Sequence, residues 1–172
     1  MERTFPAPSA ETADARRLFL DYLDFYRATI EEKLTGMSDA ELRRSRLPSG
    51  WTPIELLKHL VFMEQRWLVW GFEAEPVAAP WGDRGPADTW YVSDDESLSD
   101  LVAALHRGGA RTREIVEGAD LAALGAVGGR FGSDEEPPPT LIWILFHVLQ
   151  EYARHAGHLD IARELSDGAV GE

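Results

Sequence analysis

Four long segments of the chain repeat apolar residues with the 3.6-residue period of an α-helix, and turn-forming residues separate them. Two of the intervening stretches, residues 72–92 and 120–139, are rich in glycine and proline and predict long irregular loops. The predicted helices cover, to within a few residues, 12–34, 53–70, 93–118 and 140–167. Four helices with two long connections predict an all-α fold, a four-helix bundle, with residues 1–172 in a single domain.

Local signals indicate where several helices begin and end. A Ser or Thr followed three residues later by Glu is typical of a capping box, and such pairs begin at Ser38, Thr52 and Ser93. Ser38 predicts a short helix between the first two long ones. Pro53 suits the first helical position, and Gly168 is placed to end the last helix. The inward-facing stripe of the first helix is expected to consist of Leu18, Tyr22, Phe25, Thr29 and Leu34.

The formal charge of −13 excludes several classes of partner. So acidic a surface repels the phosphates of nucleic acids and the headgroups of anionic membranes. The longest apolar run, residues 141–149, is far shorter than the ~20 residues that a membrane span requires. The N-terminus lacks the layout of a secretory signal, and the chain has no cysteine, hence neither a disulfide nor a thiol nucleophile. We expect a cytoplasmic protein that binds neither nucleic acid nor membrane.

Ionisable residues interrupt two helical stripes that are otherwise apolar. One stripe of the last helix comprises Ile144, Val148, Glu151, His155 and His158, and one of the second helix comprises Leu56, His59, Met63, Trp67 and Trp70. A carboxylate inside a bundle is costly unless it is paired or ligated. If the bundle faces the two stripes, His59 lies opposite Glu151 and His155. Two imidazoles and one carboxylate form a ligand set for zinc or another divalent ion, with positions left open for water or substrate.

The same residues also have structural interpretations. A lone histidine on an apolar face is commonly a hydrogen-bonded core residue, and Glu followed four residues later by His is a common helical pair. His147 is a substitute ligand, a neighbour of the site or a structural residue, whereas His106 is expected to have no function. Trp67, Trp70 and Trp143 are expected in the core. Trp51, Trp81 and Trp90 either pack in the core or a dimer seam, which we favour, or line the mouth of a pocket.

Two segments resemble helices of the DinB-like superfamily: Trp51-Thr-Pro-Ile-Glu-Leu-Leu-Lys-His59-Leu, and Glu151-Tyr-Ala-Arg-His155-Ala-Gly-His158-Leu-Asp160. The resemblance covers the whole chain in helix order and implies an up-down-down-up four-helix bundle, usually a homodimer, that binds one divalent metal through three side chains. Many members use three histidines; Glu151 in place of one is similar to the mycothiol-dependent maleylpyruvate isomerase branch. The resemblance thus implies His59, Glu151 and His155 as ligands of zinc, or of nickel, iron or manganese, with His158 supporting or structural.

The resemblance also implies a transferase or isomerase that acts on a small-molecule substrate with a low-molecular-weight thiol such as mycothiol. An open metal position would favour the thiolate form of the thiol, and a chain without cysteine is compatible with a thiol supplied from outside. Only two of the 17 basic Lys and Arg residues are lysines, which is typical of a GC-rich genome and favours mycothiol. Two alternatives stay open: a non-catalytic, stress-related metal- or ligand-binding module closed by His147 or His158, and a structural dimeric bundle with a hydrogen-bonded polar interior.

Overall fold

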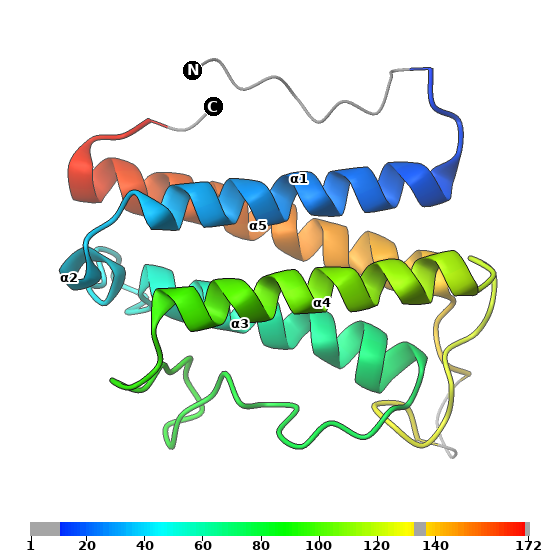
Figure 1. The fold of residues 1–172 in the computed structure, drawn as a ribbon. Coiled ribbons are helices and arrows are strands. Elements are labelled where there is room, and N and C mark those ends of the chain that lie inside the picture. Colours follow the sequence, from blue (N-terminus) through cyan, green and yellow to red (C-terminus); the bar gives the residue numbers. More distant parts are fainter. Residues whose placement is uncertain (1–10, 133–136, 171–172) are drawn as a thin grey trace.

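The computed structural model of the protein describes residues 11–132 and 137–170. Four long helices form the bundle: α1 (Ala15–Thr35), α3 (Pro53–Trp67), α4 (Leu98–Gly118) and α5 (Leu141–Asp167), with the short α2 (Asp39–Leu42) after α1. Helices α1 and α5 run in one direction and α3 and α4 in the other (Figure 1). This order confirms the predicted all-α, up-down-down-up bundle, and the described residues contain no β-strand, only two isolated bridges.

Side-chain caps account for most of the helix boundaries. Capping boxes at Ser38 and Thr52 open α2 and α3, and Gly168 ends α5 in the left-handed conformation at φ 75°. The predicted start of α4 is wrong by one turn, because its capping box is formed by Ser97 and Asp100. Ser93 does bind Glu96 as a capping pair would, but this contact closes only a turn ahead of the helix.

Helix α3 does not simply end near residue 70 as predicted. After Trp67 the chain forms a π-helical turn, η1 (Leu68–Phe72), and the last carbonyls of a helix have no partner within it. The loop after α4 satisfies two of them: Arg130 N–H donates to the Trp70 carbonyl at 3.0 Å, and Ala126 N–H donates to that of Phe72 at 2.7 Å. A Cβ on Gly129 would overlap the Trp70 carbonyl oxygen, so this close approach requires glycine.

Two expectations about burial are wrong in part or in full. In α1 Thr29 and Leu34 are buried as predicted, but Leu18, Tyr22 and Phe25 are only half-buried, and the buried face there consists of Phe19, Leu20 and Leu23. The first half of the stripe is displaced by about one residue, because apolar residues occupy several faces of this segment and contacts with other helices select among them. Trp143, expected in the core, lies on the outer side of α5 and is 51% exposed.

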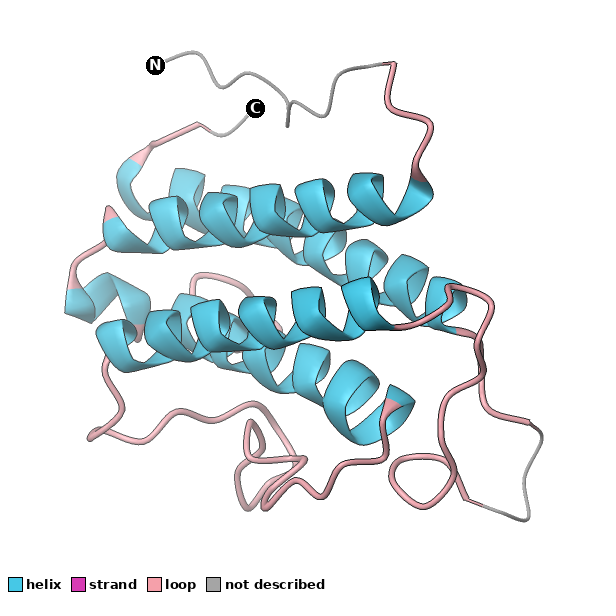
Figure 2. Ribbon diagram, turned by 45° about the vertical axis from the view of Figure 1, so that its right-hand side comes forward, coloured by secondary structure: helices cyan, strands magenta, loops and turns pink. Residues whose placement is uncertain are grey.

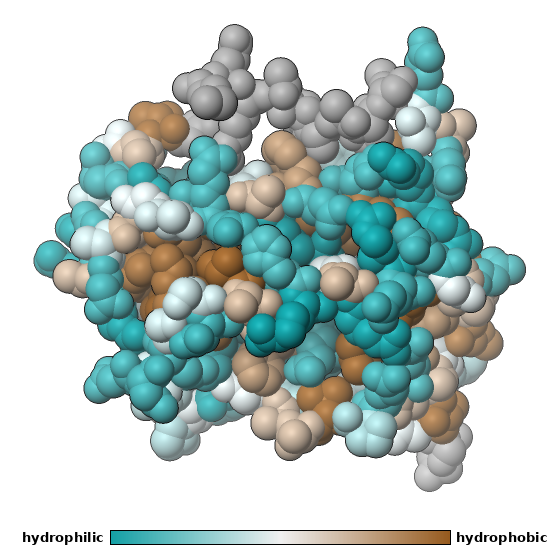
Figure 3. Space-filling model, viewed as in Figure 1, coloured by the Kyte–Doolittle hydropathy of each residue, from teal (hydrophilic) through white to brown (hydrophobic). Residues whose placement is uncertain are grey.

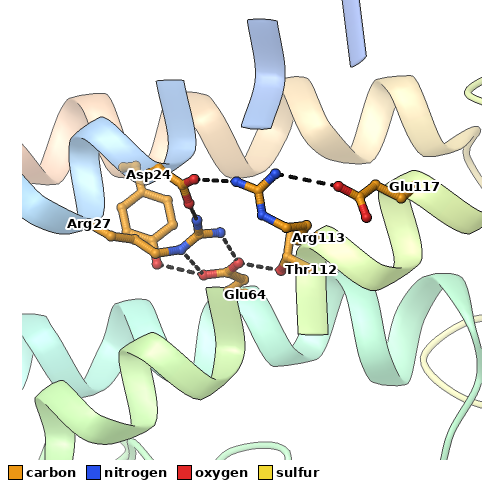
Figure 4. Close-up of polar contacts among 7 residues, drawn as sticks. Asp24, Arg27, Glu64, Thr112, Arg113 and Glu117 are labelled. Atoms are coloured by element: carbon orange, nitrogen blue, oxygen red, sulfur yellow. Dashed lines mark hydrogen bonds and ion pairs between the residues drawn. The ribbon is translucent and has the colours of Figure 1, made fainter. Parts of the chain in front are cut away.

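A charged cluster lies inside the bundle and joins all four long helices (Figure 4). Glu64 of α3 is its centre: Arg27 of α1 donates to it, in part from Nε at 3.2 Å, Tyr152 of α5 donates at 2.6 Å, and the Thr112 hydroxyl of α4 also donates. Arg27, Glu64, Thr112 and Tyr152 are all buried. Because each polar group has a partner, the cluster avoids most of the penalty of an unpaired buried charge.

The two long loops take different courses around the bundle (Figures 1 and 2). Since α3 and α4 run in the same direction, residues 73–97 must return along the bundle to reach the start of α4, whereas residues 119–132 and 137–140 lie at one end. On the face over α1 and α4, hydrophilic residues predominate, broken by small apolar areas (Figure 3). None of the described helices is long and apolar enough to cross a membrane.

Candidate metal centre

The structure brings together the three residues that the sequence singled out. His59 extends from α3, and Glu151 and His155 extend from neighbouring turns of α5. One ligand atom from each residue lies within 4.8 Å of the others. Nε2 of His155 is 3.2 Å from Oε2 of Glu151, and the His59 and His155 rings are 5.1 Å apart between centroids. His155 is buried, and the other two are half-buried.

A carboxylate from the loop between η1 and α4 contacts the first of these histidines. Nδ1 of His59 is 3.0 Å from Oδ2 of Asp83, a residue that is only 1% exposed. Arg66, about two turns after His59 on α3, donates to both oxygens of Asp83 at 2.6 and 3.0 Å. Arg66, Asp83 and His59 therefore form a continuous chain of hydrogen bonds that ends at the candidate centre.

The electrostatics of the site favour a neutral His59 imidazole beside ionised Asp83 and Glu151 carboxylates. Burial lowers the pKa of His59 and outweighs the hydrogen bond to Asp83, which acts in the opposite direction. Burial alone would raise the pKa of Asp83, but hydrogen bonds from His59 and Arg66 lower it. The hydrogen bond with His155 lowers the pKa of Glu151. Since an ionised carboxylate only accepts, Asp83 accepts the Nδ1 proton of His59, and Nε2 of His59 keeps its lone pair.

The remaining histidines lie outside the group of three. His158 contacts His155, and the Nδ1 atoms of the two rings are 3.3 Å apart. His147 stacks on Trp143 at 5.6 Å, and its Nε2 is 3.7 Å from Glu151. Burial lowers the pKa of both His147 and His158. His106, expected to lack a function, pairs with Glu31 on the surface at 2.9 Å.

Two tryptophans border the centre. The Trp90 indole stacks on His59 with centroids 4.2 Å apart and meets His155 edge-on at 5.5 Å. Trp51 lies 6.2 Å from the His158 ring. Both tryptophans also line a pocket of about 430 Å³ at the start of α3. Trp51 and Trp90 thus meet both interpretations of the loop tryptophans, since they pack against the core, as we favoured, and also line a pocket. Trp81 is 43% exposed and is not among the residues that line this pocket.

Sequence reasoning missed Asp83, Arg66 and the buried Glu64. Asp83 lies in an irregular stretch, and its partner His59 is 24 residues away, so no local period connects them. A backbone turn places it: Tyr91 N–H donates to the Asp83 carbonyl at 2.9 Å, which also brings the adjacent Trp90 over α3. Glu64 had a detectable signal, because it interrupts the apolar series Leu57, Leu60 and Leu68 at helical spacing.

Comparisons with known proteins agree with this fold. A solved structure of a conserved protein from Enterococcus faecalis superimposes with a TM-score of 0.62 at 16% identity, covering 92% of this chain and 100% of that one, and this likeness concerns the fold. No curated protein matches the sequence significantly. The family model described as mycothiol-S-transferase matches residues 18–168, a span that includes His59, Glu151 and His155. The chain is therefore a DinB-like helical bundle and belongs to the mycothiol-S-transferase family.

Proposed function

We propose that this protein is a metal- and thiol-dependent transferase or isomerase, acting in the cytoplasm with mycothiol as cosubstrate. The observation that carries the proposal is the convergence of His59, Glu151 and His155 on one point between α3 and α5. These residues would hold one divalent ion, with zinc expected first and nickel, iron or manganese as other candidates. Membership of the mycothiol-S-transferase family supports the choice of thiol.

The donor set fits such an ion. Two imidazoles and one carboxylate are typical of catalytic zinc, in which three protein ligands leave further positions for water or substrate. The ligand atoms lie within 4.8 Å of one another, so small side-chain movements would bring all three to one ion. Within residues 11–132 and 137–170, the group of possible metal ligands consists of His59, Glu151 and His155. His147 and His158 do not belong to this group. This arrangement favours an open centre over one closed by a fourth histidine.

Hydrogen bonds behind the histidines would orient both as ligands. Nδ1 of His59 already donates to Asp83, which leaves Nε2 available. Nε2 of His155 faces Glu151, so a ligand role requires the proton of this ring to sit on Nδ1, where Nδ1 of His158 can accept it. Each histidine would then have a partner on its second nitrogen, the arrangement commonly found around protein-bound metals.

A bound divalent ion would lower the pKa of a thiol that reaches it and thus favour the nucleophilic thiolate. In the proposed transfer, the sulfur of the thiol forms a bond to an electrophilic carbon of the second substrate. The bond between that carbon and its leaving group breaks, the leaving group departs with the electron pair, and the thiol proton is released. Trp90, which covers His59, would shield the site from bulk water.

Metal content is the first test of the proposal. Protein purified without a histidine tag is expected to hold about one divalent ion per chain, and His59→Ala and Glu151→Ala are each expected to lose it, as measured by elemental analysis. His106→Ala is the matched control, because His106 is an exposed histidine far from the centre and should leave the metal content unchanged. A native protein that contains no metal, even after reloading, would leave the structural hydrogen-bonded bundle as the better interpretation.

Turnover is tested with mycothiol and monochlorobimane, whose chloride is displaced when the thiol sulfur binds carbon. The expected result is a fluorescent adduct that forms faster with the metal-loaded protein than with the chelator-treated protein or with Glu151→Ala. A metal-containing protein that neither binds mycothiol nor accelerates its transfer would support the non-catalytic metal-binding module instead.

A further inference from the structure

A pocket beside the candidate metal centre has no role in the chemistry described so far. It lies between residues 49–55, at the start of α3, and the turn formed by residues 84–90, and its volume is about 430 Å³. Pockets of about 300–1,000 Å³ are typical of small-molecule sites. Trp90 belongs to both places: it lines the pocket and stacks on His59 at 4.2 Å. A molecule in this pocket is therefore one indole ring away from the centre.

Two tryptophans form the apolar part of the pocket. The Trp51 and Trp90 rings are 6.4 Å apart between centroids and inclined by 60°, so they form two sides of a corner rather than a closed stack. Rigid indole faces of this kind provide a large contact area at a low cost in conformational entropy. The C–H faces of pyranose and cyclitol rings are apolar and flat enough to pack on them.

The polar part of the pocket offers two carboxylates as hydrogen-bond acceptors, but its one cationic side chain is already paired. Its charged residues are Glu55, Arg84 and Asp88, and Ser49 and Thr89 contribute to the same lining. Arg84 is already engaged, since it donates to Asp88 at 2.7 Å and lies 4.5 Å from the Trp81 ring. A hydroxyl-rich ligand can donate to these carboxylates. A ligand that ends in carboxylates would be repelled by them and by a chain of net charge −13.

We propose that this pocket binds the uncharged sugar and polyol part of the thiol cosubstrate and selects against thiols that end in carboxylates. The inference rests on the proposed thiol-dependent function. Mycothiol carries its cysteinyl group on a glucosamine joined to inositol, a neutral pseudo-disaccharide. Bacillithiol instead ends in malate, with two carboxylates, and glutathione is likewise anionic. The pocket would hold the sugar rings on Trp51 and Trp90 while the cysteinyl arm extends past Trp90 toward the three candidate ligands.

The first experiment uses an uncharged probe that has no sulfur, the N-acetylglucosaminyl-inositol pseudo-disaccharide, titrated calorimetrically into protein kept metal-free with EDTA. We expect it to bind, and Trp51→Ala to weaken binding roughly three- to tenfold, the loss of one aromatic contact. Leu124→Ala, which truncates an exposed apolar side chain in the other long loop, is the control and should bind as the native protein does. No binding of the probe to the native protein would overturn the inference.

The second experiment tests the charge selectivity with Asp88→Asn. Asp88 has a positive φ of 57°, a conformation that Asn tolerates well, so the variant keeps the turn while it removes one negative charge and releases Arg84. The native protein is expected to prefer mycothiol over bacillithiol in KM, and Asp88→Asn to reduce that preference severalfold. An equal KM for both thiols in the native protein, or an unchanged ratio in the variant, would contradict the proposed selection.

These outcomes separate the pocket from the proposed function. If the probe binds metal-free protein but mycothiol shows no metal-dependent binding or transfer, the pocket stands and the proposed function fails. If metal-dependent transfer of mycothiol occurs but the probe does not bind and Trp51→Ala leaves KM unchanged, the function stands and the pocket assignment is wrong.

Discussion

Asp83 is the residue through which the loop between η1 and α4 acts on the candidate centre. It is almost fully buried, accepts two hydrogen bonds from Arg66, and holds Nδ1 of His59 at 3.0 Å. Carboxylates in this position fix the tautomer and ring orientation of a ligating histidine and increase its basicity. Asp83 is thus a positioning residue, since it reaches the centre only through His59.

We predict that Asp83→Asn weakens metal binding by about 10- to 100-fold, the range found when such supporting carboxylates are replaced. The physical reason is that a neutral amide no longer stabilises the required tautomer of His59 by charge. Competition with a chromophoric chelator measures the affinity, and the absorption spectrum of the cobalt-substituted protein reports whether the ligand field has changed.

Asp88→Asn is the matched control, because it makes the same substitution in the same turn without touching His59. Thermal unfolding of both metal-free variants checks that the fold persists. An Asp83→Asn variant with native metal affinity and a native cobalt spectrum would show that Asp83 serves only to neutralise Arg66.

The limits of sequence reasoning at this scale follow from the range of the contacts. His59, Glu151 and His155 could be found because each breaks the apolar period of its own helix. Asp83 breaks no period, since it lies in a loop, and its significance comes from a fold that brings it to His59. The loop tryptophans were recognised as unusual, but only the folded turn determines that Trp90 lies over His59.

Among the elements, the contacts of Glu64 hold all four long helices in one relative arrangement. Arg27, Thr112 and Tyr152 reach it from α1, α4 and α5. Burial and the charge of Glu64 raise the pKa of Tyr152, so its hydroxyl remains a donor. Because Tyr152 directly follows Glu151 in sequence, this cluster also fixes the rotation of α5 that presents Glu151 and His155 to α3.

We predict that Glu64→Ala lowers the free energy of unfolding by about 3–5 kcal/mol, since it leaves Arg27 buried without its main counter-charge. Urea denaturation of the metal-free proteins measures the change. Asp24→Ala is the comparison variant: Asp24 also pairs with Arg27, but its side chain is 51% exposed, so its loss should cost less than about 1 kcal/mol. Similar losses in both variants would contradict the special role of the buried partner.

Helix positions were predictable where a single local signal was present. Thr52 and Gly168 each stand alone at a helix end, and both act as expected. The start of α4 had two competing signals four residues apart, Ser93 with Glu96 and Ser97 with Asp100, and both pairs form in the structure. Lys58 of α3 also binds Glu96 at 2.7 Å, a tertiary contact that keeps Glu96 in the loop and that no sequence window contains.

At the scale of the whole molecule, α5 is apolar on two opposite sides. Its inner side carries buried residues such as Leu145 and Tyr152, but its outer side exposes Trp143, Phe146 and Ile161 by 50–60%. A helix that is apolar all round is normally buried all round, and exposed apolar areas of this kind mark interfaces. The homodimer implied by the resemblance to the DinB-like superfamily therefore stays a prediction, with the outer side of α5 as its expected seam.

We predict that the native protein elutes at twice the chain mass of 19.2 kDa and that Ile161→Glu shifts it toward the monomer, because each seam would then bury an unpaired carboxylate. Size-exclusion chromatography with light scattering measures the mass. Val170→Glu, which places the same charge on an 80% exposed apolar residue beyond α5, should leave the mass unchanged. A native protein that is monomeric at all concentrations would rule the seam out.

The parallel direction of α3 and α4 has a consequence for how such a protein can change. Because both run the same way, residues 73–97 have to travel back along the bundle, and this return brings Asp83 and Trp90 to the side of α3 that carries His59. The candidate ligands therefore belong to helices, whereas one wall of the pocket belongs to a connection that packs outside them. Insertions and substitutions at residues 84–89 can alter what the pocket accepts while the helices keep the ligand geometry, so selectivity and metal binding can evolve separately.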